Sequence, residues 1–341
     1  MPEAVHIILC VDDEAGILRA LNRLLSRAGY NVLTAESGER GLEILKREPV
    51  NLIISDQRMP GMLGNEFLQL SRKIRPEAGQ IILTAHADVQ TAIAAIDQGG
   101  ICKFLLKPWN DSALLEAIKG ELKEKDLELK LQEYEQNKEY AMIFGLATLA
   151  ESRDSDTGGH LQRVRTYTRI LAEQLTTIDK YTQVLTPDWI QNAARSSVLH
   201  DIGKVGIPDS VLLKPGPLTP EEWEVMKTHC IIGGDTLRAS ESTLNIGKET
   251  FLSMGRDIAY YHHERYDGKG YPFELVGEAI PLVARIVTVA DGYDALRSKR
   301  PYKAPLSHKT VRTMILEGRG KHYHPEVVDA FINREADFKS V

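Results

Sequence analysis

The pentapeptide HDIGK, residues 200–204, places an imidazole beside a carboxylate, with a lysine three positions after the carboxylate. Neighbouring residues on a helix point about a quarter-turn apart, so His200 and Asp201 would hold different sides of a metal cluster. Such a pair is a weak signal alone, because most isolated histidines in apolar segments are ordinary core residues. Metal chemistry therefore requires further ligands elsewhere in the chain.

Two capping motifs predict the helices that bring such ligands close. In "TPDWIQNAARSSVLHDIGK" Thr186 is expected to be the N-cap and Pro187 the first helical residue, so His200 would lie near the end of that helix. In "TPEEWEVMKTH" a threonine and a glutamate have capping-box spacing, and the helix would carry His229 toward its C-terminal part.

Further candidates lie on or beside other predicted helices of an all-α C-terminal half. They are His160 before a helix from about residue 161, the pair His262–His263 at the end of a helix over 251–264, and Asp291 in a helix over 282–296. The complete set is five imidazoles and two carboxylates: His160, His200, Asp201, His229, His262, His263 and Asp291. These are enough donors for two metal ions, with Asp201 as a bridge and positions open for water and substrate. Mixed nitrogen and oxygen donors favour iron, manganese or zinc over calcium or magnesium.

Residues between these ligands suit a phosphate-containing substrate. Lys204 and Arg300 could neutralise phosphodiester oxygens, and "RYDGKGYP" offers glycines for a tight loop and Tyr271 as a hydrogen-bond donor. The alternative for each of the two cations, taken alone, is an exposed surface charge.

The first 110 residues contain five short apolar runs separated by amphipathic segments: "HIILCV", "NVLT", "NLIIS", "QIILT" and "KFLLK". This alternation predicts a doubly wound α/β domain with a parallel sheet. Polar residues follow four of the strands, where such a fold places its site: Asp12, Asp13, Asp56, Thr84 and Lys107. Clustered carboxylates repel one another, so they favour a magnesium ion among Asp12, Asp13 and Asp56, and they make Asp56 a candidate phosphoryl acceptor.

From Asp111 to about residue 136 the composition shifts to glutamate, lysine and leucine, which predicts a helical linker. Leu115, Ile118, Leu122 and Leu129 form one stripe of this helix. Two interpretations remain open, a parallel dimer contact and a solvated helix that leans on its own domain.

The overall composition restricts the function. A chain of 341 residues favours two domains, and 42 basic against 48 acidic residues give a net charge of −6 without a long basic block, so nucleic acid binding is not expected. No apolar run reaches the roughly 18 residues of a membrane span, and the N-terminus turns acidic before a signal-peptide core could form. The three cysteines form no CxxC pair, and Cys230 beside His229 is expected only to pack within a helix. We therefore expect a cytoplasmic protein that does not bind membranes.

Residues 1–120 resemble the receiver domain of bacterial response regulators, through "VDDE", "SDQRMPGMLG", "LTAHAD" and "FLLKPW". The resemblance implies a sensor histidine kinase as partner and a role for each motif residue. Asp56 would be phosphorylated, Asp12 and Asp13 would hold magnesium, Thr84 and Lys107 would contact the phosphoryl oxygens, and Phe104 would report the switch.

Residues 141–341, joined to the receiver by a linker over 121–140, resemble the HD-GYP phosphodiesterase domain. The motifs are "GGHLQRV", "HDIGKVGIPDSVLLKPGPLTPEEWEVMKTH", "HHERYDGKGYP" and "VADGYDAL". The resemblance implies hydrolysis of cyclic di-GMP at two or three metals, usually iron or manganese, held by the seven residues above. It also implies phosphate binding by Lys204 and Arg300, with Tyr271 in the signature loop. Asp156 stands where members with a third metal often have glutamate.

We therefore expect a response regulator that cleaves cyclic di-GMP to pGpG, and further to GMP if the product rebinds, under control of Asp56 phosphorylation. The main alternative is a non-catalytic module that binds the dinucleotide or a partner such as a diguanylate cyclase (GGDEF) protein. Another cyclic dinucleotide or a nucleotide phosphate is an alternative substrate, because metal ligands recognise phosphate and not the base. A DNA-binding output is not expected, because no basic recognition helix is evident.

Overall fold

The computed structural model describes residues 6–85, 103–153, 159–244, 250–298 and 305–341. The chain divides into two units, Met1–Asn137 and Lys138–Val341. Each unit has hydrophobic cores of its own.

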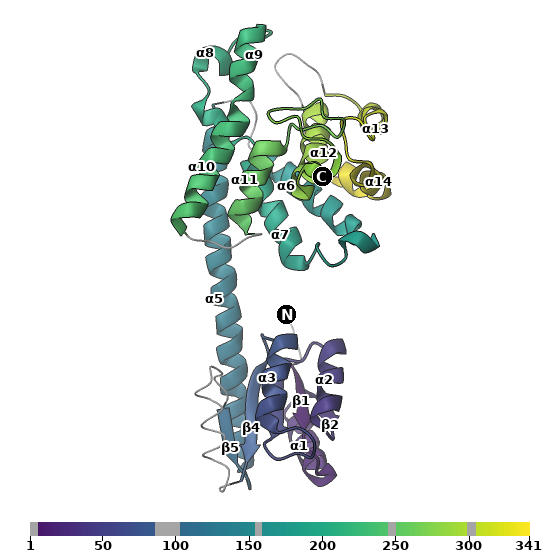
Figure 1. Cartoon of the computed structure of the whole chain (residues 1–341). Helices are drawn as coiled ribbons and strands as arrows, with labels where there is room; N and C mark the ends of the chain where they lie inside the picture. The colour runs from purple at the N-terminus through teal and green to yellow at the C-terminus, as the bar shows by residue number, and fades with distance from the viewer. Residues whose placement is uncertain (1–5, 86–102, 154–158, 245–249, 299–304) are drawn as a thin grey trace. The chain divides into compact units, whose positions relative to one another are not determined.

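The first unit is built on a five-stranded parallel sheet with the strand order β2-β1-β3-β4-β5 (Figure 1). Its strands are β1 (Ile7–Val11), β2 (Asn31–Ala35), β3 (Leu52–Asp56), β4 (Gly79–Thr84) and β5 (Lys103–Leu106). Its described helices are α1 (Ala15–Arg27), α2 (Gly38–Arg47), α3 (Gly64–Ile74) and the first part of α5 (Asp111–Glu151). The predicted doubly wound fold is confirmed.

Helices cover both faces of this sheet because alternate strand residues point to opposite sides. On one face Ile54 and Ile81 pack in a cluster with Leu21 of α1 and Ile118 of α5. On the other face Ile53 packs in a cluster with residues of α2 and α3. All five residues of β3 are buried, so the sheet's carboxyl edge presents polar side chains on a rigid support.

Helix α5 runs from Asp111 to Glu151, beyond the expected end near residue 136. The extension is consistent with its sequence, because "EYAMIFGLATLAE" contains good helix formers and no proline. Within the first unit, Ile118 and Leu122 of the predicted stripe are buried in the core while Leu129 is exposed. The interpretation that this helix packs on its own domain therefore holds for the first part of the stripe. Among the described residues, no helix is both long and apolar enough to cross a lipid bilayer.

The second unit is mainly helical, as predicted. Its α-helices are α6 (Gly159–Leu175), α7 (Pro187–Ser196), α8 (Asp209–Leu212), α9 (Pro220–Lys227), α10 (His229–Leu244), α11 (Phe251–Tyr261), α12 (Leu282–Arg297), α13 (His308–Glu317), α14 (Pro325–Asn333) and α15 (Glu335–Ser340). Short 3-10 helices are η2 (Asp179–Tyr181), η3 (Ser197–Leu199), η4 (Ile202–Gly206) and η5 (Gly277–Ala279).

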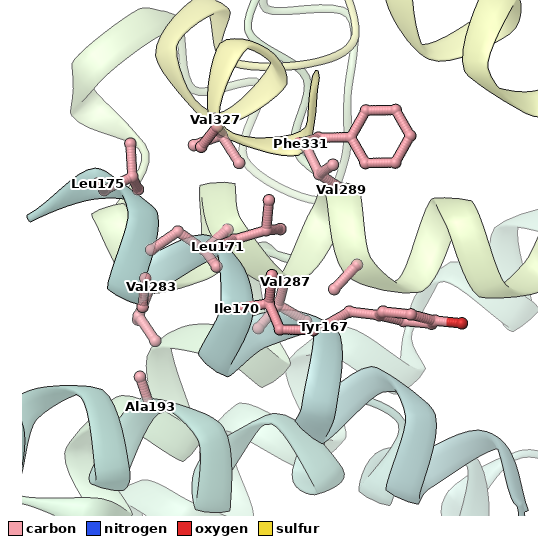
Figure 2. Packing of buried hydrophobic residues seen from close by; sticks show 14 of the residues in the cluster. Tyr167, Ile170, Leu171, Leu175, Ala193, Val283, Val287, Val289, Val327 and Phe331 are labelled. Carbon is pink, nitrogen blue, oxygen red and sulfur yellow. The ribbon is translucent and has the colours of Figure 1, made fainter. Parts of the chain in front are cut away.

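The main core of the second unit lies between α6, α7, α12 and α14 (Figure 1). Figure 2 shows Leu171 and Leu175 of α6, Val283 and Val287 of α12, and Val327 of α14 in this core. Burying these apolar side chains fixes α6 and α12, which carry His160 and Asp291.

The predicted caps are confirmed, but two helix boundaries differ from expectation. Thr186 is the N-cap of α7 and is followed by a proline in the first helical position. Thr219 is the N-cap of α9 and forms its capping box. Helix α7 ends at Ser196, so His200 follows the 3-10 helix η3 instead of ending α7. The prediction that His229 lies in the C-terminal part of α9 was wrong, because α9 ends at Lys227 and His229 is the first residue of α10. The Thr228 hydroxyl donates to the Val225 carbonyl 2.7 Å away at the break between the helices.

Candidate functional site

Four histidines of the second unit present the same ring nitrogen to one buried region. The Nδ1 atoms of His200, His229 and His262 lie 2.9, 2.7 and 3.0 Å from the backbone oxygens of Ser197, Met226 and Ile258. The Nδ1 of His160 lies 2.7 Å from Asp294 Oδ2. Donation of an Nδ1 proton to each oxygen leaves Nε2 with its lone pair, which is the tautomer that binds a metal.

Asp201 lies between two groups of these histidines. Its Oδ1 is 3.3 Å from His229 Nε2 and 3.6 Å from His262 Nε2. Its Oδ2 is 3.3 Å from His200 Nε2 and 2.8 Å from Lys204 Nζ. The two carboxylate oxygens thus face different sets of donors, as expected for a bridging ligand.

The first group contains His200 and is completed by His160 of α6 and Asp291 of α12. His160 Nε2 is 3.4 Å from His200 Nε2 and 3.5 Å from Asp291 Oδ1. Asp294, which orients His160, accepts from Arg163 Nε at 2.6 Å and is almost fully buried. Two lone pairs and a carboxylate oxygen that converge at these distances fit a cation between them.

The second group surrounds the histidine pair. The ring of His263 stacks on Tyr271, with centroids 4.7 Å apart, and lies 5.2 Å from the ring of His229. Cys230, expected only to pack within a helix, has its Sγ 3.4 Å from His229 Nε2. Ligand atoms of His229, Cys230, His262 and His263 all lie within 4.8 Å of one another.

Electrostatics of the region favour a bound cation. Burial raises the pKa of Asp201, but the charges of Lys204 and His200 outweigh it and hold that pKa well below its usual value. Burial lowers the pKa of His200, yet the carboxylate of Asp201 outweighs burial and raises it to about 10. Burial lowers the pKa of His229 to about 4, and burial beside other imidazoles holds that of His263 well below its usual value. The shifts of Asp201 and His200 show that positive charge beside this carboxylate is favoured.

Several buried polar atoms here find no hydrogen-bond partner among the described residues. They are Asp201 Oδ1, His262 Nε2 and Glu151 Oε2. Each such atom costs about 1–3 kcal/mol when it is left unpaired. Their grouping beside the inward-facing nitrogens fits metal ions as the missing partners.

The structure brings together most of the residues predicted for this site. The seven ligand candidates, Lys204 and Tyr271 lie in or beside it, whereas Asp156 and Arg300 lie outside the described residues. Sequence reasoning missed Glu151, Asp294 and Arg163. Asp294 could have been found, because it lies one helical turn after Asp291. Glu151 lies at the end of another helix and has no such spacing signal.

In the first unit the predicted receiver residues gather at the carboxyl edge of the sheet. Lys107 Nζ lies 2.8 Å from Asp12 Oδ2 and forms an ion pair with Asp56. Burial raises the pKa of Asp12 although Lys107 opposes the shift. Thr84 is buried at the end of β4.

The two remaining receiver residues are exposed, Asp13 beside Asp12 and Phe104 on β5. The buried carboxylates of Asp12 and Asp56 are thus paired with the Lys107 ammonium.

Two family models match the chain. The response regulator receiver domain matches residues 8–119, and the HD domain matches residues 146–327. Both predicted resemblances are thereby confirmed at the level of the domain family.

Curated relatives match over both domains. A cyclic di-GMP phosphodiesterase of Vibrio cholerae is 42% identical over 100% of this chain and 70% of its own length. A probable cyclic di-GMP phosphodiesterase of the same organism is 38% identical over 97% of this chain and 78% of its own. The cyclic di-GMP phosphodiesterase response regulator RpfG of Xanthomonas campestris is 34% identical over 98% of this chain and 89% of its own. The chain therefore belongs to the family of response regulators in which a receiver domain is joined to an HD domain.

Proposed function

We propose that this protein is a response regulator whose HD domain hydrolyses cyclic di-GMP to pGpG, and that phosphorylation of Asp56 controls this activity. The single observation that carries the proposal is the convergence of three Nε2 atoms on the Asp201 carboxylate, with the Nε2 of His160 3.4 Å from that of His200. The substrate follows from the names of relatives that match nearly all of the chain.

Two or three divalent ions, with iron or manganese proposed, fit the donors that the structure presents. His160, His200 and Asp291 would hold one ion, and the three remaining histidines (His229, His262 and His263) would hold another. Asp201 would bind both. Asp156 is proposed as a further ligand if a third ion binds. Such ions supply Lewis acidity, which makes water nucleophilic near neutral pH and neutralises phosphate oxygens.

Protein side chains position the phosphodiester. Lys204, whose ammonium lies 2.8 Å from Asp201, is proposed to attract a non-bridging phosphate oxygen. Burial raises the pKa of Tyr271, so its hydroxyl stays protonated and can donate a hydrogen bond. Arg300 is proposed to contact the second phosphate.

In the reaction a water oxygen bonds to phosphorus while the bond from phosphorus to the sugar 3′ oxygen breaks. The 3′ oxygen takes a proton, and the product is linear pGpG. A second cleavage of rebound pGpG would give GMP.

Product analysis tests the proposal. Protein purified without oxygen and loaded with iron or manganese is incubated with cyclic di-GMP, and the nucleotides are separated by chromatography. We expect pGpG from the natural sequence and none from Asp201→Ala, whereas Asp329→Ala, at an exposed carboxylate, should retain activity. Intact cyclic di-GMP with metal-loaded protein contradicts the proposal. Binding without turnover indicates the non-catalytic module, and preferential cleavage of a related dinucleotide changes the substrate.

For the receiver, we propose that a sensor histidine kinase supplies the phosphoryl group to Asp56 in the cytoplasm. Asp12, Asp13 and Asp56 are proposed to bind magnesium in place of the Lys107 ammonium. Thr84 and Lys107 would then contact the phosphoryl oxygens, and Phe104 would report the switch. Diguanylate cyclases, which make the substrate, are proposed functional partners.

A homodimer is proposed through α5. In the first unit Leu127, Leu131 and Tyr134 lie four and three residues apart, so they share one helix face, and all three are more than half exposed. Light scattering of the full chain tests this. We expect the mass of a dimer, and of a monomer for the double variant Leu127→Gln with Leu131→Gln. The control is Leu213→Gln, an exposed leucine of the second unit. A monomeric natural sequence contradicts the proposal.

A further inference from the structure

Glu151, the last residue of α5, is a buried carboxylate that no predicted motif includes. Only 5% of its surface is exposed, although a carboxylate is expensive to bury unless a partner compensates for its charge. Burial raises its pKa, which the nearby His200 and His160 oppose. The contacts of Glu151 indicate which kind of partner could compensate for a charge at this position.

The contacts of Glu151 point to the first ligand group. Its Oε1 lies 3.8 Å from His160 Nε2, too far for a hydrogen bond, and its Oε2 has no hydrogen-bond partner among the described residues. One ligand atom from each of Glu151, His160 and His200 lies within 4.8 Å of the other two. The gap between the carboxylate and the histidine nitrogens is larger than a hydrogen bond and is suited to a shared ion.

The other ring nitrogen, Nδ1, of each histidine beside Glu151 already has a partner. Asp294 already occupies His160 Nδ1 and the Ser197 carbonyl occupies His200 Nδ1. Since Nε2 of both rings faces the carboxylates of Glu151 and Asp291, the donor set is two imidazoles and two carboxylates. Such a set suits manganese or ferrous iron.

We propose that Glu151 is a direct metal ligand on the His160 side of the cluster, in addition to the seven ligands predicted from the sequence. This inference rests on the proposed metal centre, and it assigns a carboxylate from α5 to that centre. The competing role is an ion pair between Glu151 and a protonated His160, in which Glu151 never touches a metal.

Manganese titration of the full chain tests the inference, with free Mn²⁺ followed by its electron paramagnetic resonance signal. For Glu151→Gln, which keeps the shape and removes the charge, we expect the Kd of at least one bound ion to rise about tenfold or more. Glu151→Asp keeps the charge on a shorter side chain, so its Kd should lie between those of the natural sequence and Glu151→Gln. Circular dichroism verifies that each variant is folded.

The matched control is Glu241→Gln, which removes a carboxylate paired with Arg256 at 2.7 Å and should leave every Kd within twofold. Asp156→Asn, titrated in parallel, tests whether the acidic residue nearer to His160 in the chain contributes separately.

The titration distinguishes failure of the proposed metal centre from failure of the inference about Glu151. If the natural sequence binds no Mn²⁺, or binds it no more tightly than His200→Ala, the proposed metal centre itself is wrong. If the natural sequence binds Mn²⁺ and folded Glu151→Gln binds it equally well, the centre stands and Glu151 is not a ligand.

Discussion

The orientation of His160 depends on one carboxylate that does not face the proposed metals. Asp294 accepts from His160 Nδ1 and is held in turn by two Arg163 nitrogens at 2.6 and 2.9 Å. We expect Asp294→Asn to weaken metal binding by about 10–100-fold, because the amide can donate to His160 and favour the wrong tautomer. Mn²⁺ titration measures the effect.

Asp329→Asn is the matched control, because Asp329 forms the same paired contact with Arg319 on an exposed surface. It should not change metal affinity. Equal affinity of Asp294→Asn and the natural sequence would show that the orientation of His160 does not depend on this carboxylate.

His324, which is not among the predicted ligands, should make stability depend on pH. His324 is 4% exposed, and burial with the nearby Arg285 lowers its pKa to about 4. The unfolded chain binds this proton near pH 6.5 and the folded chain does not, so the free energy of unfolding falls as the pH drops from about 6.5 toward 4. The loss at pH 5 is on the order of 2 kcal/mol.

Urea unfolding at pH 7.5 and 5, for the natural sequence and His324→Phe, measures this contribution. The phenylalanine keeps a ring beside Tyr266 and cannot titrate. We expect the variant to lose less stability between the two pH values, and other titrating groups cancel in the comparison. Parallel losses in both proteins contradict the assignment.

The sequence predicted most of the residues of the candidate site, but it predicted few of the side chains that contact them. His200, Asp201 and His229 stand in motifs whose spacing fixes them, and the structure places them within 3.3 Å contacts. Glu151 reaches the site only because helices pack together, and no local pattern carries that information, whereas Arg163 lies one helical turn after His160 in "GGHLQRV". Cys230 was expected to pack in a helix, and its closeness to His229 Nε2 follows from the start of α10.

Among the elements, the contact between η4 and α10 holds the HDIGK segment against His229. A Cβ at Gly203 would lie 1.9 Å from the His229 carbonyl oxygen and 2.5 Å from Gly233 N, both of which are backbone atoms. Gly203→Ala must therefore separate the two elements. We expect a loss of about 1–3 kcal/mol in the unfolding free energy and weaker metal binding.

Gly145→Ala is the control for this substitution. Gly145 lies in α5 and has no atom within 4 Å of the position of an added Cβ, so alanine should be neutral or stabilise by up to about 1 kcal/mol. Thermal melts and Mn²⁺ titration compare the two variants. Unchanged stability for Gly203→Ala would show that the backbone contact can relax.

Element types were predictable and some element ends were not. The apolar runs and the caps at Thr186 and Thr219 gave the strands and helix starts, because these signals are local. The ends of α5, α7 and α9 depend on tertiary packing and on single residues such as Thr228. For that reason His229 was expected one helix too early.

For the whole molecule, the joined receiver and HD domains predict that phosphorylation changes turnover. A phosphoryl mimic such as beryllofluoride, added with magnesium, should change the rate of cyclic di-GMP hydrolysis by the natural sequence. It should not change the rate for Asp56→Asn, which lacks the acceptor carboxylate. Metal loading of the HD domain must be matched in all samples. An identical rate with and without the mimic, in protein shown to bind it, contradicts the coupling.

The candidate metal ligands differ in their exposure to solvent. His160, His200, His229 and His262 are at most 3% exposed, whereas His263, Asp291 and Tyr271 are only partly covered. We therefore expect substrate and incoming ions to approach past these partly exposed residues. A nucleotide product bound at these residues should obstruct that approach. The exchange of bound ions for labelled ones should therefore be slower for as long as the product stays bound.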